Sequence, residues 1–150
     1  MVALFRFIIS RLIQDFLLSH GDAPNGGVAI AELIAQNNTL LELKTARNHI
    51  RKQCARLLVD KLALNTSLRL LDLSHNDIAD QEARLFSRSL HVHPALTHVD
   101  LSSNCIGSKG AIALAYAAQQ PDSAMQYLNL NGNNIGRMGG VYMLRAMRAV

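Results

Sequence analysis

The apolar positions of this chain recur in a fixed spacing. Between residues 68 and 78 the spacing is L-x-x-L-x-L-x-x-N-x-I. The same spacing begins again at Leu96, 28 positions later, and at Met125, 29 positions after that. A weaker copy begins at Leu40, in which Thr45 is the only polar residue at an apolar position. Agreement among four registers predicts a repeat architecture rather than a series of unrelated elements.

Each copy predicts a short strand followed by a helix. In the copy at residues 68–78, alternation turns Leu71 and Leu73 inward and turns Leu70 and Asp72 outward. An apolar stripe at helical spacing follows each strand. Such units bury a continuous core only when neighbouring copies stack on one another. The sequence therefore predicts a parallel sheet on the concave side of an arc and helices on its convex side.

An asparagine ends each predicted strand and its turn. The four asparagines are Asn48, Asn76, Asn104 and Asn133. A side-chain amide both donates and accepts hydrogen bonds, so it can satisfy backbone groups in the turn of a neighbouring copy. We expect these residues to form a structural ladder without a catalytic role.

Two further positions recur near the predicted helix starts. Asp80 and Ser108 are equivalent residues, and both suit an N-cap that accepts hydrogen bonds from the first backbone N–H groups of a helix. Gly110 and Gly139 share a second position, where a small residue permits close packing. Cys54 holds that second position in an earlier copy, so we expect it to fill a small space in the core.

The first 39 residues predict a helical cap for the array. Apolar residues over residues 4–19 follow an i, i+1, i+4, i+5 pattern, which indicates a helix with one wide apolar face. A rival interpretation makes residues 12–22 a decayed repeat, but Asp15 stands where a strand needs an apolar residue. The sequence GDAPNGG at residues 21–27 predicts a turn, and residues 28–37 predict a second helix. We expect one continuous domain, with repeats at residues 40–67, 68–95, 96–124 and 125–150.

Composition and charge fit a repeat domain that is not specialised for nucleic acid. Of the 150 residues 49% are hydrophobic and only 5% are aromatic, so the core is expected to consist of Leu, Ile, Val and Ala. The net charge of +4 is too small to indicate nucleic-acid binding. No stretch approaches the ~20 apolar residues that a membrane span needs, and charged residues interrupt any signal peptide.

Two cysteines point to a reducing compartment. Cys54 and Cys105 fall at different positions of repeats two apart, and equivalent positions of such repeats lie ~10 Å apart. That separation exceeds the reach of a disulfide bond. We therefore expect free thiols and a cytoplasmic location, either in the cell of origin or in a host cell after secretion.

The period of 28 to 29 residues over residues 40–150 resembles the leucine-rich-repeat family, in particular its ribonuclease-inhibitor-like subclass. The resemblance implies an α/β solenoid, a right-handed βα arc with a concave parallel sheet. It also implies protein–protein recognition, as in ribonuclease inhibitor and in the sensing domains of NOD-like receptors. Ran GTPase-activating proteins share this repeat, so a GTPase regulator acting through Arg47 at the rim is an alternative. A bacterial effector delivered into a host cell is another.

Motifs for catalysis or metal binding are absent from the sequence. It contains no G-x-x-x-x-G-K-[ST], H-E-x-x-H, C-x-x-C or G-x-S-x-G. His91 and His93 are two apart near a helix end, a spacing that splays them, and His49 and His75 lack a third ligand. We expect a protein that is not an enzyme and that needs neither cofactor nor metal.

The outward strand positions are the best candidates for binding a partner protein. They line up across the copies as three rows: Glu42, Leu70, His98 and Tyr127; Lys44, Asp72, Asp100 and Asn129; and Ala46, Ser74, Ser102 and Asn131. The eight residues of the first two rows are the candidates. Adjacent strands would place Asp72 and Asp100 ~4.8 Å apart, where like charges repel. We expect Lys44, His98 or a cation of the partner to relieve this repulsion, and we expect the open face to bind another protein.

The last repeat predicts an open edge. Nothing follows its helix that could cover the strand expected at residues 126–130, so apolar surface and backbone groups are expected to be exposed there. Two explanations remain open: the edge pairs with a second copy in a homo-oligomer, or the chain is the front part of a longer one.

Overall fold

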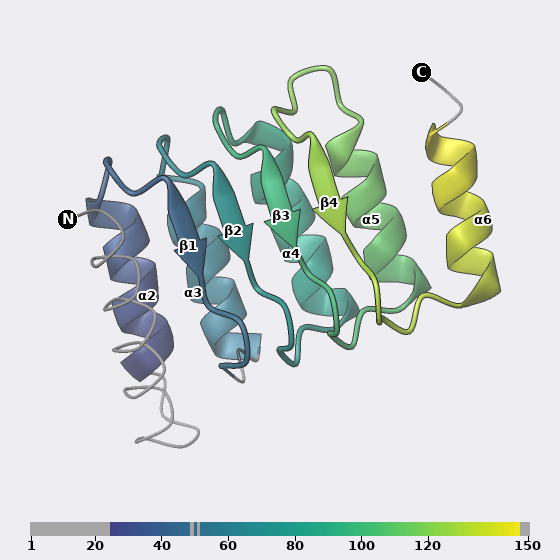
Figure 1. Cartoon of the computed structure of the whole chain (residues 1–150), viewed down its shortest axis with the longest axis horizontal. Coiled ribbons are helices and arrows are strands. Elements are labelled where there is room, and N and C mark those ends of the chain that lie inside the picture. Colours follow the sequence, from purple (N-terminus) through teal and green to yellow (C-terminus); the bar gives the residue numbers. More distant parts are fainter. Residues whose placement is uncertain (1–24, 49, 51, 148–150) are drawn as a thin grey trace.

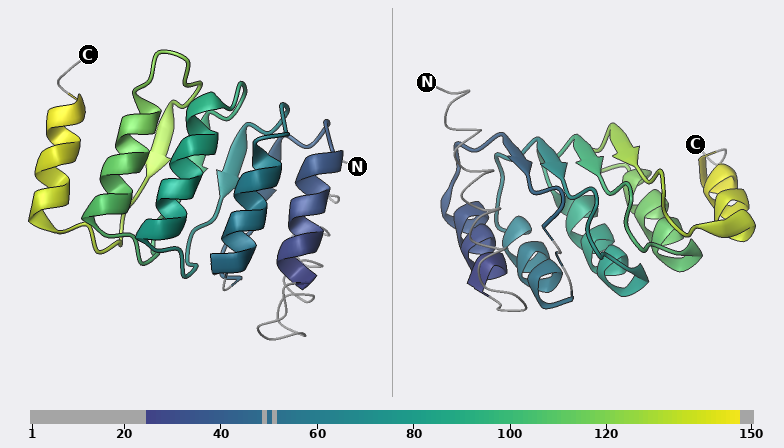
Figure 2. Two further views of the ribbon diagram at one scale, coloured as in Figure 1. Left: turned by 180° about the vertical axis from the view of Figure 1, so that it is seen from behind. Right: turned by 60° about the horizontal axis from the view of Figure 1, so that its bottom comes forward.

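Strands and helices alternate throughout the part of the chain that the structure describes. This structure is a computed structural model that describes residues 25–48, 50 and 52–147. The elements are α2 (Asn25–Gln36), β1 (Glu42–Lys44), α3 (Lys52–Leu62), β2 (Leu70–Asp72), α4 (Asp80–Val92), β3 (His98–Asp100), α5 (Ser108–Ala118), β4 (Tyr127–Asn129) and α6 (Gly136–Met147). The strands form one layer and the helices form a second layer behind it (Figures 1 and 2).

The four strands form a single parallel sheet in sequence order, β1-β2-β3-β4. Leu43 pairs with Leu71, Leu71 with Val99, and Val99 with Leu128. This is the register that the repeat spacing predicts, and a slip by one residue would turn every inward side chain to the other face. With one face of the sheet covered by helices, the predicted α/β solenoid is confirmed.

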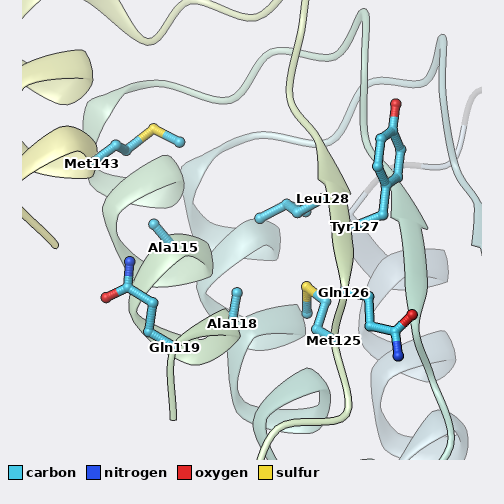
Figure 3. A pocket seen from close by; sticks show the side chains of 8 residues that line it. All are labelled: Ala115, Ala118, Gln119, Met125, Gln126, Tyr127, Leu128 and Met143. Carbon is cyan, nitrogen blue, oxygen red and sulfur yellow. The ribbon is translucent and has the colours of Figure 1, made fainter. Parts of the chain in front are cut away.

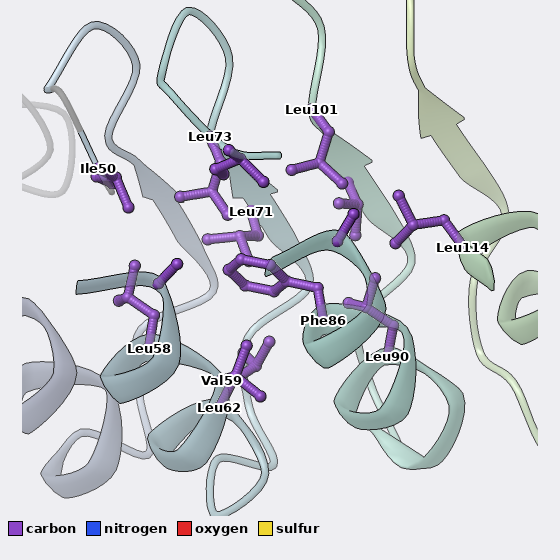
Figure 4. Close-up of a cluster of buried hydrophobic side chains, with 14 of the residues drawn as sticks. Ile50, Leu58, Val59, Leu62, Leu71, Leu73, Phe86, Leu90, Leu101 and Leu114 are labelled. Carbon is purple, nitrogen blue, oxygen red and sulfur yellow. The ribbon is translucent and has the colours of Figure 1, made fainter. Parts of the chain in front are cut away.

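The core is a continuous apolar layer between the sheet and the helices (Figure 4). The inward residues of the first three strands and the equivalent residues of α3, α4 and α5 are all nearly inaccessible to solvent: Leu43, Leu71, Val99, Leu58, Phe86 and Leu114. In the last repeat, Leu128 and Met143 hold the corresponding positions and are only partly buried. The core is therefore complete across β1 to β3 and thins at β4 and α6.

Thr45, the polar residue at an apolar position of the first copy, is fully buried. Its hydroxyl donates a hydrogen bond to the backbone carbonyl of Asp72 in the adjacent repeat, over 3.2 Å. A buried hydroxyl is costly only when it lacks such a partner. The neighbouring repeat thus makes threonine acceptable here.

The second predicted helix begins earlier than expected. The turn predicted at residues 21–27 is wrong for residues 25–27, which form the first turn of α2. Ile30, Ala31 and Ile34 are buried, and the packing of an amphipathic face generally outweighs the low helix propensity of a few residues. The helix predicted over residues 4–19 lies outside the described residues.

The predicted N-caps Asp80 and Ser108 are wrong for their own helices. The N-cap residues are Ala79 for α4 and Gly107 for α5. Each predicted cap acts on the following repeat instead. Asp80 Oδ1 accepts hydrogen bonds from the backbone N–H groups of Gly107 and Gly110, both over 2.8 Å, and the Ser108 hydroxyl donates to the carbonyl of Ile135. Stacking brings these groups together, and the free N–H groups at the start of α5 can donate to any nearby acceptor, here the carboxylate of Asp80.

Candidate functional site

The side of the sheet that faces away from the helices, called the sheet face below, carries two rows of side chains in register. The first row is Glu42, Leu70, His98 and Tyr127, and the second is Lys44, Asp72, Asp100 and Asn129. The structure therefore brings together the eight side chains that the sequence proposes for partner binding. Each row crosses all four strands.

The first row ends in an exposed pair of rings. His98 and Tyr127 stack with their centroids 5.8 Å apart and an angle of 27° between the ring planes. Tyr127 remains 51% exposed, and the Thr97 hydroxyl lies 2.8 Å from Nδ1 of His98. Exposed aromatic side chains held in place by a neighbour are favourable contact residues, because little conformational entropy is lost when a partner covers them.

The second row holds two carboxylates, and each of them accepts a hydrogen bond from a backbone N–H group. Asp72 Oδ1 accepts from the backbone N–H of Ser74 over 2.9 Å, and Asp100 Oδ1 accepts from that of Ser102 over 2.8 Å. Asp100 Oδ2 also accepts from the side-chain amide of Asn129 over 3.0 Å.

These contacts decide the charge state of Asp100. Burial raises the pKa of Asp100, but hydrogen bonds from Ser102 and Asn129 and the nearby charge of His75 act in the opposite direction, and the pKa is lowered on balance. Asp100 is thus held as a carboxylate. For Asp100, the groups that favour the charged form are Ser102, Asn129 and His75, and neither Lys44 nor His98 is among them. Relief of the repulsion by Lys44 at Asp72 or by a cation of the partner stays a prediction.

The rim of the sheet face is built from residues with left-handed backbone. Arg47, His75 and Ser103 have φ values of 60°, 53° and 53°, and the equivalent Gly132 has 70°. This conformation costs a residue with a Cβ atom roughly 1–2 kcal/mol. It recurs in every repeat, so it belongs to the turn and does not single out Arg47. The GTPase-regulator alternative therefore stays a prediction.

The asparagines act across the boundaries between repeats. Asn76 Oδ1 accepts hydrogen bonds from the N–H groups of Asn48 and Ile50, both over 3.0 Å. Its amide nitrogen donates to the carbonyls of Thr45, Leu73 and Ser74. Equivalent bonds join Asn104 to the N–H of Ile78, over 3.1 Å, and Asn133 to the N–H of Ile106, over 3.0 Å.

Asn48 stands at the start of this ladder. Its amide nitrogen donates to the Ala46 carbonyl over 2.9 Å, while its Oδ1 is buried without a hydrogen-bond partner in the described part of the chain. In the other repeats the equivalent oxygen accepts hydrogen bonds from backbone N–H groups of the preceding repeat. The open acceptor thus marks the first described boundary of the array.

A second ladder, in the turns before the strands, escaped the sequence analysis. Asn37 Oδ1 accepts from the N–H groups of Thr39 and Leu40, and Asn65 Oδ1 does so from Ser67 and Leu68. The signal was the 28-residue spacing that links positions 37, 65 and 93. It was hidden because the third residue is a histidine.

His93 is that third member. Its Nδ1 accepts from the N–H groups of Ala95 and Leu96 over 3.3 and 3.0 Å. The side chain is only 2% exposed, and burial lowers the pKa of His93 below its ordinary value of 6.5. The neutral ring is thus part of the fold, because a proton on Nδ1 would remove both hydrogen bonds.

Stability should consequently fall in mild acid. Because the pKa of His93 is lower in the folded state, the stabilisation is complete above pH 6.5 and is lost as the pH falls toward the folded-state pKa. We expect the urea midpoint of the wild-type protein to drop more between pH 7 and pH 5 than that of His93→Asn, in which the amide replaces the ring as in Asn65. The exposed His98→Asn is the control and should keep the wild-type pH dependence. Equal drops for wild type and His93→Asn would contradict this role.

Several predictions concern metals, thiols and membranes. Nowhere in residues 25–48, 50 and 52–147 do three or more His, Cys, Asp or Glu side chains gather so that they could hold a metal ion. His49 lies outside the described residues, so its proximity to His75 is not described.

Burial raises the pKa of the Cys54 thiol to about 11, whereas Cys105 is exposed. Among the described helices, none combines the length and apolarity that crossing a membrane requires.

Comparison with known proteins supports the repeat and the fold. The sequence model of a family described as "Leucine Rich repeat" matches residues 64–81, 92–115 and 124–143. These segments begin just before β2, β3 and β4, and each contains one of the asparagines of the ladder. The fold is a leucine-rich-repeat solenoid.

Two solved structures share this leucine-rich-repeat fold. The C-terminal domain of tropomodulin from Caenorhabditis elegans matches with a TM-score of 0.71 and 14% identity, over 81% of this chain and 75% of that one. A structure described as actin-binding site 2 of leiomodin-1 matches with a TM-score of 0.67 and 18% identity, over 79% of this chain and 70% of that one. No curated protein matches the sequence significantly. At these identities the similarity concerns the fold.

Proposed function

We propose that this leucine-rich-repeat solenoid is a non-catalytic module that binds another protein through its sheet face. The observation that carries the proposal is the placement of the stacked His98–Tyr127 pair beside the carboxylate of Asp100 on an exposed sheet. Rings and a charged group side by side provide apolar contact area and a directional polar contact. Both are typical of residues that dominate binding energy.

The charge of the second row indicates what the partner offers. Asp72 and Asp100 are paired across β2 and β3, and hydrogen bonds favour the charged form of Asp100. A basic side chain of the partner, such as arginine, would meet both the carboxylates and an adjacent ring, since guanidinium groups bind carboxylates and stack on aromatic faces. We therefore propose a partner surface with at least one arginine or lysine.

Two considerations support binding rather than catalysis. The two rows lie on an exposed sheet, and the known examples of this repeat act mainly in protein interactions. The leiomodin-1 structure is described as an actin-binding site, which makes actin filaments a defined first probe for this chain. The spacing of 28 to 29 residues supports the ribonuclease-inhibitor-like subclass.

The test replaces one side chain from each row. Asp72→Asn together with Tyr127→Ala removes a charge and a ring, while the asparagine oxygen still accepts from the N–H of Ser74. We expect capture of the partner, or co-sedimentation with actin if actin is the partner, to weaken by about 30-fold, which corresponds to about 2 kcal/mol. The melting temperature should stay at the wild-type value.

A matched control carries the same changes on the helix layer. Asp60 on α3 and Tyr116 on α5 are both exposed, so Asp60→Asn with Tyr116→Ala alters charge and aromatic area to the same extent. This variant should bind as the wild type does. Equal losses in the two variants, or a loss in the control alone, would refute the sheet face as the binding surface.

A further inference from the structure

Backbone groups link each strand of the solenoid to the next one. At the boundary between β3 and β4, the Thr97 carbonyl accepts from the N–H groups of Gln126 and Tyr127, both over 2.9 Å. The N–H of Leu101 donates to the Asn129 carbonyl over 2.9 Å. The N–H of Ser103 donates to the Asn131 carbonyl over 2.8 Å. The same set joins β1 to β2 and β2 to β3. Besides the hydrogen bonds of the strand ladders themselves, each boundary thus uses one acceptor and two donors in a fixed order.

The equivalent groups of β4 lie at the edge of the sheet and have no neighbouring strand among the described residues. They are the carbonyl of Gln126 and the N–H groups of Leu130 and Gly132, and within the described residues none of them has a backbone partner. An edge of this kind is a template for a further strand. Because the three earlier boundaries are all parallel, the template specifies a parallel fifth strand.

Apolar space lies next to this edge. A pocket of about 450 Å³ between α5, β4 and α6 is lined by Leu128, Met125, Met143 and Ala118 among others (Figure 3). Ala118 is equivalent to Leu62 of α3 and Leu90 of α4, both of which are buried. The smaller side chain leaves the last layer of the core underfilled. A large apolar side chain beside Leu128 would cover this space.

Within the described part of the chain, the outer side of helix α6 is not covered by another element. A Cβ atom added at Gly140 would meet no atom within 4 Å, although the equivalent Ala55, Ala83 and Ala111 are fully buried. One turn further on, Leu144 is 60% exposed. The apolar surface therefore continues from the pocket, which Met143 lines, onto the exposed Leu144 of α6.

Charge distinguishes two possible occupants of this edge, a second copy of the chain and an acidic segment of another protein. Residues 123–150 include three arginines and no aspartate or glutamate, and Arg137 and Arg145 lie near opposite ends of α6. In a symmetric dimer the same surface of a second copy would oppose these arginines with like charges. A segment with acidic side chains would instead be attracted at both ends.

We propose that the open edge of β4 and the outer side of α6 form a docking site for an extended segment of a partner protein. The segment adds as a fifth parallel strand, places a large apolar residue beside Leu128, and carries aspartate or glutamate on either side of that residue. The site is distinct from the sheet face, because it uses backbone groups at the edge and the helix layer.

A synthetic peptide tests the proposal. The probe has the sequence of residues 122–133, itself a strand of this solenoid, with the changes Gln126→Glu and Asn131→Asp. We expect binding with a Kd on the order of 100 μM, as suits a small interface. At saturation, amide hydrogen exchange measured by NMR should slow about tenfold or more at Leu130 and Gly132, because their N–H groups become hydrogen-bonded.

Matched variants and peptides identify the occupant. Leu144→Asp should abolish binding, whereas Leu64→Asp, which adds the same charge at an exposed position outside α6, should leave it intact, as should Asp72→Asn on the sheet face. A peptide with lysine at both altered positions should not bind. Binding of the lysine peptide, or no protection of Leu130 and Gly132 at 1 mM acidic peptide (about ten times the expected Kd), would overturn the proposal. Protection that grows with protein concentration in the absence of peptide would overturn it in favour of a second copy.

Discussion

Asn76→Ala should lower the free energy of unfolding by about 4 kcal/mol, because it leaves several buried backbone groups without partners and each such group costs roughly 1–3 kcal/mol. The Asn76 side chain is buried and serves two N–H groups and three carbonyls in two adjacent repeats. Its loss therefore weakens the boundary between β1 and β2 from both sides. Urea denaturation followed by far-UV circular dichroism measures the change.

Two companion variants show whether the hydrogen bonds cause this loss. Asn76→Asp keeps an oxygen for the N–H groups of Asn48 and Ile50 but loses the donor to three carbonyls, so it should fall between wild type and Asn76→Ala. Asn131→Ala removes an exposed side chain two residues before the equivalent Asn133 and should change stability by less than about 0.5 kcal/mol. A similar small effect for Asn76→Ala would show that water replaces the amide.

Gly110→Ala should destabilise the protein by about 2–3 kcal/mol, the cost of forcing a methyl group into a filled space. An added Cβ atom would lie 2.7 Å from Asp80 Oδ1, 2.9 Å from the Cβ atom of Ala83 and 2.9 Å from a methyl carbon of Ile106. Ala83 and Ile106 are fully buried, so α5 would have to move away from α4. That movement would also stretch the hydrogen bonds from Gly107 and Gly110 to Asp80.

Gly140→Ala is the matched control in the next helix. The added Cβ atom meets nothing within 4 Å, and alanine is favoured over glycine inside a helix by about 0.5–1 kcal/mol. The two substitutions should therefore change the thermal midpoint in opposite directions. If both raise it, α4 and α5 do not pack as closely as described.

The register of the sheet and the composition of the core could be predicted because both follow from repetition. Once Leu71, Val99 and Leu128 are equivalent, stacking places them side by side whatever the details of the turns. The direction of Asp80 could not be predicted in the same way. Capping rules consider a residue and its own helix, whereas the backbone groups that Asp80 binds are 27 and 30 positions later in the chain.

The candidate site also combines features that could be predicted from the sequence with features that could not. Alternation along the strands places Asp100 and Tyr127 on the sheet face, and the structure has them there. Alternation does not tell which neighbour holds Asp100 as a carboxylate, because that depends on the orientation of the Asn129 amide and on the distance to His75. Ser74, expected to point outward, is instead buried, and its carbonyl accepts hydrogen bonds from the N–H of Arg47 and the side-chain amide of Asn76.

Side chains that serve the adjacent repeat have a consequence for how the array comes apart. Asn76, Asp80 and Ser108 each form hydrogen bonds with groups of another repeat. Opening one boundary therefore leaves polar atoms without partners on both sides of it. Partly melted forms with a single detached inner coil are thereby penalised, and coupling between neighbours of this kind makes a linear array lose its structure in one cooperative step.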